Sequence, residues 1–194
     1  MLAPWRSPHR IDPVVARHEL RALFGERKPV IVTDPARNPY PLLAARESDC
    51  ECISLFTADP DSELHEVAPH LVIPRGTGPF IRTWASLWGE STGFLFASDA
   101  PVHKVRTHLR RFLMVGAPGG ERVYFRFYDP RVLRAFLPVC TPEEVATFFG
   151  PIVEIACEDV DPTHLLRFTH DAGKLQIRRE IARFLQPSPG EARA

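Results

Sequence analysis

Apolar and polar positions along the chain follow two periods that alternate from one segment to the next. Short runs rich in β-branched and aromatic residues predict strands, and apolar residues three or four apart predict helices that cover a sheet. The predicted strands are Val30–Thr33, Cys50–Phe56, Val67–Ile73, Gly93–Ser98, Pro151–Cys157 and Leu165–Thr169. The predicted helices are Ala16–Phe24, Pro41–Arg46, a segment beginning at Pro79, Val102–Phe112, Pro130–Leu137, Pro142 to Gly150, and Lys174–Leu185.

Turn and cap residues mark where these elements begin and end. Pro118-Gly119-Gly120 predicts the turn of a hairpin between Phe112–Ala117 and Arg122–Tyr128. Thr141 followed three residues later by Glu144 predicts a capping box. Acidic, proline-bearing turns are expected at Asp59-Pro60-Asp61 and Glu158–Pro162.

Strands and helices interleave from end to end, which is typical of an α/β domain, with an α+β fold as the alternative. We expect a mixed β-sheet with flanking helices in a single compact domain, with a small C-terminal helical/β subdomain after about Cys140 as an open alternative. The expected parts are an N-terminal extension and helix over residues 1–28, the main domain over 29–170, and a C-terminal helix and loose tail over 171–194.

Composition places the chain among ordinary globular proteins. Of its 194 residues 44% are hydrophobic, and 24 Lys and Arg balance 24 Asp and Glu, so no overall field attracts nucleic acid or an anionic membrane. The first residues lack the layout of a signal peptide, and no apolar run approaches the ~20 residues that span a bilayer. A cytoplasmic protein is expected.

A search for catalytic motifs finds none that fits. The Arg75-Gly76-Thr77-Gly78 loop lacks the lysine and spacing of a phosphate loop, and the serine in Trp88–Gly93 lies before a predicted strand rather than after one. No catalytic residue and no cofactor are therefore predicted. The alternative is a small cytoplasmic enzyme whose site is assembled from dispersed His, Asp and Arg residues, for example His164 or His170 with Cys157.

Histidines and cysteines do not show metal-ligand spacing. His103 and His108 lie five residues apart, as do His65 and His70, whereas ligand pairs on a helix lie three or four apart. One residue separates Cys50 from Cys52, and a zinc ribbon requires two. Separate surface histidines, buried or half-buried free thiols and no metal site are expected.

The arginine-rich run from Lys104 to Arg134 carries the candidate binding residues. Strand alternation would put Tyr124, Arg126 and Tyr128 on one face, with Val123, Phe125 and Phe127 on the other. Three interpretations stay open: an arginine satisfied by a local acid such as Asp129, a protein-docking surface, and base stacking, which the zero net charge disfavours. The predicted partner-binding set is Tyr124, Arg126, Tyr128, Arg110 and Arg111, and a regulatory nucleic-acid binder is the weaker alternative.

An ordered set of segments resembles a known family. They are Tyr40–Leu43, Cys52–Phe56, Val67–Val72, Pro79-Phe80 followed by Trp84, Phe125–Leu133, Phe136–Glu144 and Phe148–Pro151. Together, over roughly Pro29–Phe168, they resemble the domain of unknown function 4123 family, the effector chaperones or adaptors of bacterial type VI secretion. The resemblance implies a non-enzymatic adaptor that binds a type VI effector, a cargo toxin, and helps to load it onto the spike protein VgrG.

Overall fold

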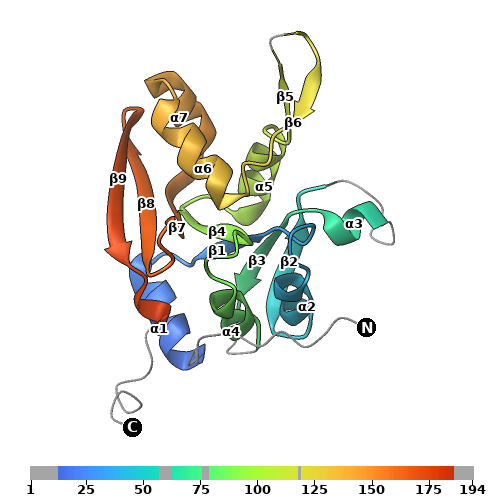
Figure 1. The fold of residues 1–194 in the computed structure, drawn as a ribbon, viewed down its shortest axis with the longest axis vertical. Coiled ribbons are helices and arrows are strands. Elements are labelled where there is room, and N and C mark those ends of the chain that lie inside the picture. Colours follow the sequence, from blue (N-terminus) through green and yellow to red (C-terminus); the bar gives the residue numbers. More distant parts are fainter. Residues whose placement is uncertain (1–12, 57–62, 76–78, 118, 186–194) are drawn as a thin grey trace.

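The structure, a computed structural model, describes residues 13–56, 63–75, 79–117 and 119–185. Seven strands form one sheet between two layers of helices, and a two-stranded hairpin projects from one end (Figure 1). In sheet order the strands are β2 (Cys50–Ser54), β3 (His70–Pro74), β1 (Val30–Thr33), β4 (Gly93–Ser98), β7 (Ile152–Glu158), β8 (His164–Asp171) and β9 (Lys174–Ile181). The hairpin pairs β5 (Met114–Gly116) with β6 (Arg122–Tyr124).

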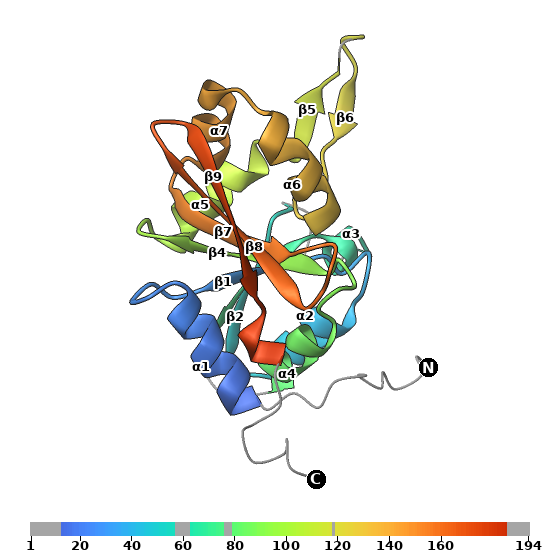
Figure 2. The same cartoon turned by 60° about the vertical axis from the view of Figure 1, so that its left-hand side comes forward.

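Helices cover both faces of the sheet. Figure 2, the view turned by 60°, shows one group with the hairpin and the other group at the opposite end of the molecule. The first group is α5 (Val102–Arg110), α6 (Pro130–Phe136), the 3₁₀ turn η1 (Leu137–Val139) and α7 (Pro142–Phe149). The second is α1 (Pro13–Leu23), α2 (Tyr40–Arg46), α4 (Pro79–Ser86) and the 3₁₀ turn η2 (Arg183–Leu185), while the short α3 (Glu63–Val67) precedes β3.

Alternate residues of the central strands feed two separate cores. Val32, Phe94 and Phe96 pack with α5, α6 and α7, whereas their chain neighbours Ile31 and Leu95 pack with α1 and α4. Because side chains alternate across a strand, a strand covered on both faces must be apolar at nearly every position. This explains the unbroken Gly-Phe-Leu-Phe-Ala run of β4.

The predicted fold class, one α/β domain with helices flanking a sheet, is confirmed. The sheet is not mixed, because the strand pairs within it are all antiparallel. Strands β1 and β2 do run in the same direction and are joined through α2, as in a βαβ unit. However, β3 inserts between them and pairs antiparallel with both.

Several predicted elements are confirmed, including β4 over its full predicted range and the Thr141–Glu144 capping box at the start of α7. The C-terminal helix predicted at Lys174–Leu185 is wrong, because Lys174–Ile181 forms β9 and pairs with β8 along its whole length. Strands β7, β8 and β9 continue the main sheet rather than forming a subdomain. Strand β3 begins at His70 rather than at the predicted Val67. Val67 is instead the last residue of α3, because Pro69 separates the helix from the strand.

Other predictions fall on residues outside the described part of the chain. They are the turn at Asp59-Pro60-Asp61, the Gly76-Thr77-Gly78 loop, residues 1–12 of the extension and the tail from Gln186. In the described part of the chain, no helix has the length and apolar character needed to cross a bilayer.

Gly93 at the start of β4 provides a test of the central packing. Its φ of +143° is rarely adopted by L residues, and a Cβ there would lie 1.8 Å from the carbonyl oxygen of Val32. We expect Gly93→Ala to lower the free energy of unfolding by about 3 kcal/mol or more, measured by urea denaturation.

Gly116 in β5 supplies the matched control. A Cβ built there meets no heavy atom within 4 Å, so Gly116→Ala should change the free energy of unfolding by less than about 1 kcal/mol. Equal effects of the two substitutions would contradict the close approach of β4 to β1.

Candidate functional site

The β5–β6 hairpin departs from the sequence prediction at its root. Strand β6 ends at Tyr124, and the chain turns between Arg126 and Asp129, where the Asp129 amide donates to the Arg126 carbonyl at 3.0 Å. The alternation predicted through Tyr128 is therefore wrong for this segment. Tyr128 follows the fully buried Phe127 into the core and is only 4% exposed, because the turn rotates its side chain inward.

Arg126 forms an ion pair with Asp34, the residue that follows β1. Its Nη2 donates to Asp34 Oδ2 at 2.5 Å; the arginine side chain is 44% exposed and the aspartate side chain 0%. Burial raises the pKa of Asp34, and the hydrogen bond from Arg126 opposes that rise. The guanidinium carbon also lies 5.7 Å from the centre of the Tyr128 ring. Arg126 and Tyr128 therefore attach the root of the hairpin to the sheet.

Tyr124 lies next to this root, because its hydroxyl donates a hydrogen bond to Tyr128, and its side chain is partly accessible. It is 43% exposed, like its neighbour Val123. The centres of the Tyr124 and Phe56 rings lie 5.8 Å apart in an edge-to-face arrangement. A cavity of about 330 Å³ opens beside Tyr124, between the hairpin, the end of α5 and the chain that follows β2. We call its lining the hairpin surface: Leu55, Phe56, Arg110, Leu113, Met114, Arg122 and Tyr124.

The five predicted binding residues thus form two adjoining groups, which Tyr124 connects through its hydrogen bond to Tyr128, and one separate residue. Tyr124 and Arg110 belong to the hairpin surface, which Arg122 joins. Arg126 and Tyr128 hold the ion pair to Asp34, while Arg111 is exposed at the end of α5 outside the cavity. Arg106, which sequence patterns did not single out, donates to the carbonyls of Ser54 and Phe56 and ties the end of β2 to α5. No local spacing signals such a contact.

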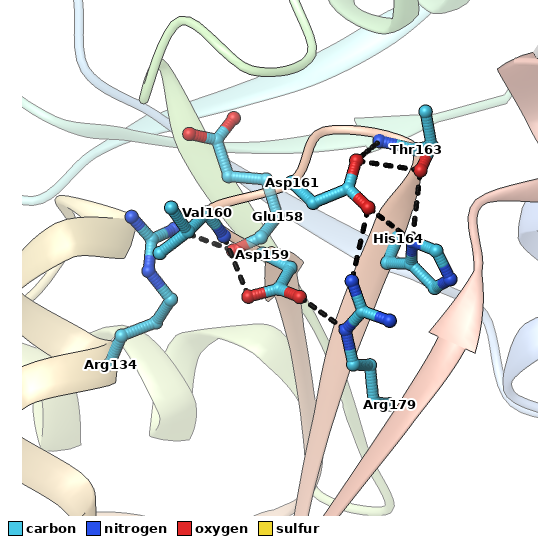
Figure 3. Close-up of polar contacts among 8 residues, drawn as sticks. All are labelled: Arg134, Glu158, Asp159, Val160, Asp161, Thr163, His164 and Arg179. Atoms are coloured by element: carbon cyan, nitrogen blue, oxygen red, sulfur yellow. Dashed lines mark hydrogen bonds and ion pairs between the residues drawn. The ribbon is translucent and has the colours of Figure 1, made fainter.

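The acidic turn between β7 and β8 is a network of internal contacts, shown in Figure 3. Asp159 and Asp161 both accept from the Arg179 guanidinium of β9, at 2.6 and 3.1 Å. Asp161 Oδ1 also accepts from the amide and hydroxyl of Thr163, and its Oδ2 lies 2.9 Å from His164 Nδ1. The prediction that these acids form a turn is confirmed.

Glu158, the last residue of β7, is oriented away from this network and into the protein. Its carboxylate accepts from the amides of Gly89 and Ser91 at 2.7 and 3.0 Å and from the Ser91 hydroxyl at 2.9 Å. Burial raises its pKa, while these hydrogen bonds oppose the rise. The Trp88–Gly93 segment is thus the helix-to-strand turn predicted from sequence, and Ser91 adopts φ +56° within it.

Two further histidines and two of the thiols lie in buried or partly buried surroundings. His70 and His108 are buried, and each places a ring nitrogen 2.8 Å from a backbone carbonyl, so the prediction of surface histidines is wrong for these two. Burial raises the pKa of Cys50 to about 11 and that of Cys157 to about 12. Among the described residues, no group of three His, Cys, Asp or Glu side chains is placed to hold a metal ion.

The sheet, its two helical layers and the projecting hairpin define a single α/β domain with exposed aromatic and arginine side chains on the hairpin. Residues 31–147 match the model of the family described as Domain of unknown function (DUF4123). The match covers more than half of the chain, which therefore belongs to this family. Neither a curated protein nor a solved structure matches the chain significantly.

The Arg126–Asp34 pair predicts a measurable coupling. Arg126→Ala leaves a buried carboxylate without its cation, so we expect the free energy of unfolding to fall by about 2 kcal/mol. Partial exposure of the guanidinium keeps the loss below the roughly 3–5 kcal/mol seen when fully buried pairs are broken. Urea denaturation of the single variants and of Arg126→Ala/Asp34→Asn measures the effect.

In the double variant the arginine substitution should cost at least about 1 kcal/mol less than it does alone. Arg111→Ala, at an exposed position, serves as control and should change stability by less than about 0.5 kcal/mol. Strictly additive effects of the Arg126 and Asp34 substitutions would show that the two side chains do not interact.

The Asp161 network predicts a dependence on acid pH. Hydrogen bonds from Thr163, together with His164, lower the pKa of Asp161 to about 2. Because the folded-state pKa lies below the unfolded value, the carboxylate stabilises the fold above the unfolded pKa and loses this effect as pH falls through about 2. Asp161→Asn should therefore be less stable than the parent at neutral pH, and the difference should vanish in acid.

Urea midpoints measured across a series of pH values test this expectation. Thr163→Val removes the hydroxyl that donates to Asp161. Like Asp161→Asn, it should reduce the loss of stability at acid pH. A difference between parent and Asp161→Asn that persists unchanged into strong acid would rule out the proposed network.

Proposed function

We propose that this chain is a non-enzymatic adaptor that binds a type VI secretion effector, a cargo toxin, and helps to load it onto the VgrG spike. Membership of the DUF4123 family supports the proposal, together with the ordered segments that resemble the effector adaptors of that family. The proposal requires two protein partners, no nucleic acid, no membrane and no cofactor. It places the chain in the cytoplasm, where cargo is loaded.

The observation that carries the proposal is the hairpin surface. The hairpin extends beyond the helical layers (Figures 1 and 2), and the residues of β6 are exposed at all three positions. Tyrosine and arginine are enriched among the residues that dominate binding energy at interfaces, and they act best where surrounding contacts exclude water. Here Tyr124 lies over Phe56 at the cavity, with Arg110 and Arg122 among its lining.

The Arg126–Asp34 pair gives this surface a fixed base. A binding element that is held rigidly before the partner arrives loses less conformational entropy on association. Arg126 and Tyr128 therefore contribute to docking by fixing the root of the hairpin. Arg111, exposed after the end of α5, adds positive charge near Arg110. The preferred cargo segment is one that brings an apolar side chain to the cavity and a carboxylate to the arginines.

Substitutions on the hairpin surface should weaken effector binding without unfolding the protein. We expect Tyr124→Ala and Arg110→Ala each to raise the dissociation constant for the effector about tenfold or more, measured by titration calorimetry. The effector to test is a toxin whose gene neighbours both the gene for this chain and a VgrG gene. Thermal unfolding of each variant should match that of the parent to within a few degrees.

Val139→Ala is the matched control, since Val139 is 78% exposed and lies on η1 outside the hairpin surface. It should bind the effector with parental affinity. Folded Tyr124→Ala and Arg110→Ala proteins that capture the effector normally would exclude this surface as the docking site.

The alternative, a small enzyme with a site of dispersed residues, is tested by metal analysis of the purified protein and by thermal shifts with metals and nucleotides. A stoichiometric metal or a large thermal shift would favour the enzyme over the adaptor.

A further inference from the structure

A second cavity, of about 330 Å³, lies at the opposite end of the sheet from the hairpin. It is bounded by α1, the chain entering β1, the ends of β2 and β3, and α4. Figures 1 and 2 both show α1 and the β5–β6 hairpin at opposite ends of the molecule, so this cavity is separate from the hairpin surface. Neither sequence motifs nor the family match assigns it a role.

Four basic residues line this cavity, with Glu51 as the one acidic residue of its lining among the described residues: Arg17, Arg21, Lys28 and Arg75. Arg17 donates to the Arg75 carbonyl at 2.9 Å, which draws α1 to the end of β3. Arg75 pairs with Glu51 at 2.6 Å. No ion pair or hydrogen bond with an acid is formed by the side chains of Arg21 and Lys28 within the described part of the chain.

This concentration of like charge is not a consequence of composition. Acidic and basic residues balance over the whole chain, and neighbouring Arg27 is neutralised by Asp99. Arg17 and Arg21 lie four residues apart on α1, a spacing at which like charges destabilise a helix. A bound anion would relieve this repulsion, and arginine guanidinium groups match the geometry of carboxylates.

The base of the cavity is aliphatic. Leu20 and Ile81 are 1% and 3% exposed, and Ile73 is half-buried beside them. A simple inorganic anion has no group that gains from contact with these side chains. Aromatic side chains, on which nucleic-acid bases stack, are absent from the described lining. The combination suits a ligand that carries both carboxylates and aliphatic side chains.

We propose that this cavity binds an acidic peptide segment of a partner protein, with aspartate or glutamate side chains on the basic rim and an aliphatic side chain on the Leu20–Ile81 base. Arg21 and Lys28 pair with the partner's carboxylates, and Arg75 exchanges part of its contact with Glu51 for the ligand. The site is independent of effector docking at the hairpin, since the two surfaces are separate.

Binding of a fluorescein-labelled peptide in which leucine alternates with aspartate tests the proposal by fluorescence anisotropy. The parent protein should bind this peptide, and binding should weaken as salt rises because the contacts are ionic. Arg21→Glu/Lys28→Glu should weaken binding about tenfold or more, since both positions are exposed and their side chains face solvent at the basic rim. A peptide with alanine in place of leucine should bind more weakly than the leucine peptide.

The charge-matched control is Lys104→Glu/Lys174→Glu, which alters net charge equally at exposed positions on α5 and β9. Its dissociation constant for the leucine–aspartate peptide should be no more than about twice that of the parent. The proposal is overturned by equal loss in both double variants, by absence of peptide binding, or by displacement of the peptide by inorganic phosphate or duplex DNA at lower concentration than by unlabelled peptide.

Discussion

Burying a carboxylate obliges the protein to supply donors for it, and three such groups determine how the loops attach to the sheet. Among the described residues the buried acids are Asp34, Asp129 and Glu158. Asp34 draws in Arg126 at the hairpin root, and Glu158 binds the turn before β4. Burial acts to raise the pKa of Asp129, but hydrogen bonds from Arg131 outweigh it, so this acid caps α6 in its charged form. Because adjacent strands are antiparallel, the end of β1, the start of β4 and the end of β7 lie at the same end of the central strands. Two of these acids, Asp34 and Glu158, lie at that end.

Local patterns predict the elements whose physics is local. The capping box of α7 requires only Thr141, Pro142 and Glu144, and the continuous apolar run of β4 indicates burial on both faces. The order of strands is not encoded in this way. Sequence patterns could not show that β3 inserts between β1 and β2, because that choice depends on which apolar faces pack together.

Misassigned residues are those whose state depends on distant partners. Leu175, Ile177 and Ile181 fit an alternating strand, yet Ile177, Ile181 and Phe184 also fit a helical stripe, and pairing with β8 decides between them. Tyr128 fits strand alternation, but the turn at Arg126 places it in the core. At the candidate site, sequence patterns identified Tyr124 and Arg110 but not Phe56, Met114 or Arg122, because the cavity forms only when β2, α5 and the hairpin converge.

The route of the chain between β4 and β7 has a consequence for how such proteins diversify. These two strands are neighbours in the sheet, yet α5, the hairpin, α6 and α7 all lie between them in sequence. The helices of this excursion contribute Val105, Leu133 and Phe148 to the core and are therefore constrained, whereas β6 is exposed at all three positions. Mutations can accumulate at the hairpin tip without disturbing strand pairing. Relatives could acquire new partner specificities by drift in this one short segment while inheriting an unchanged scaffold.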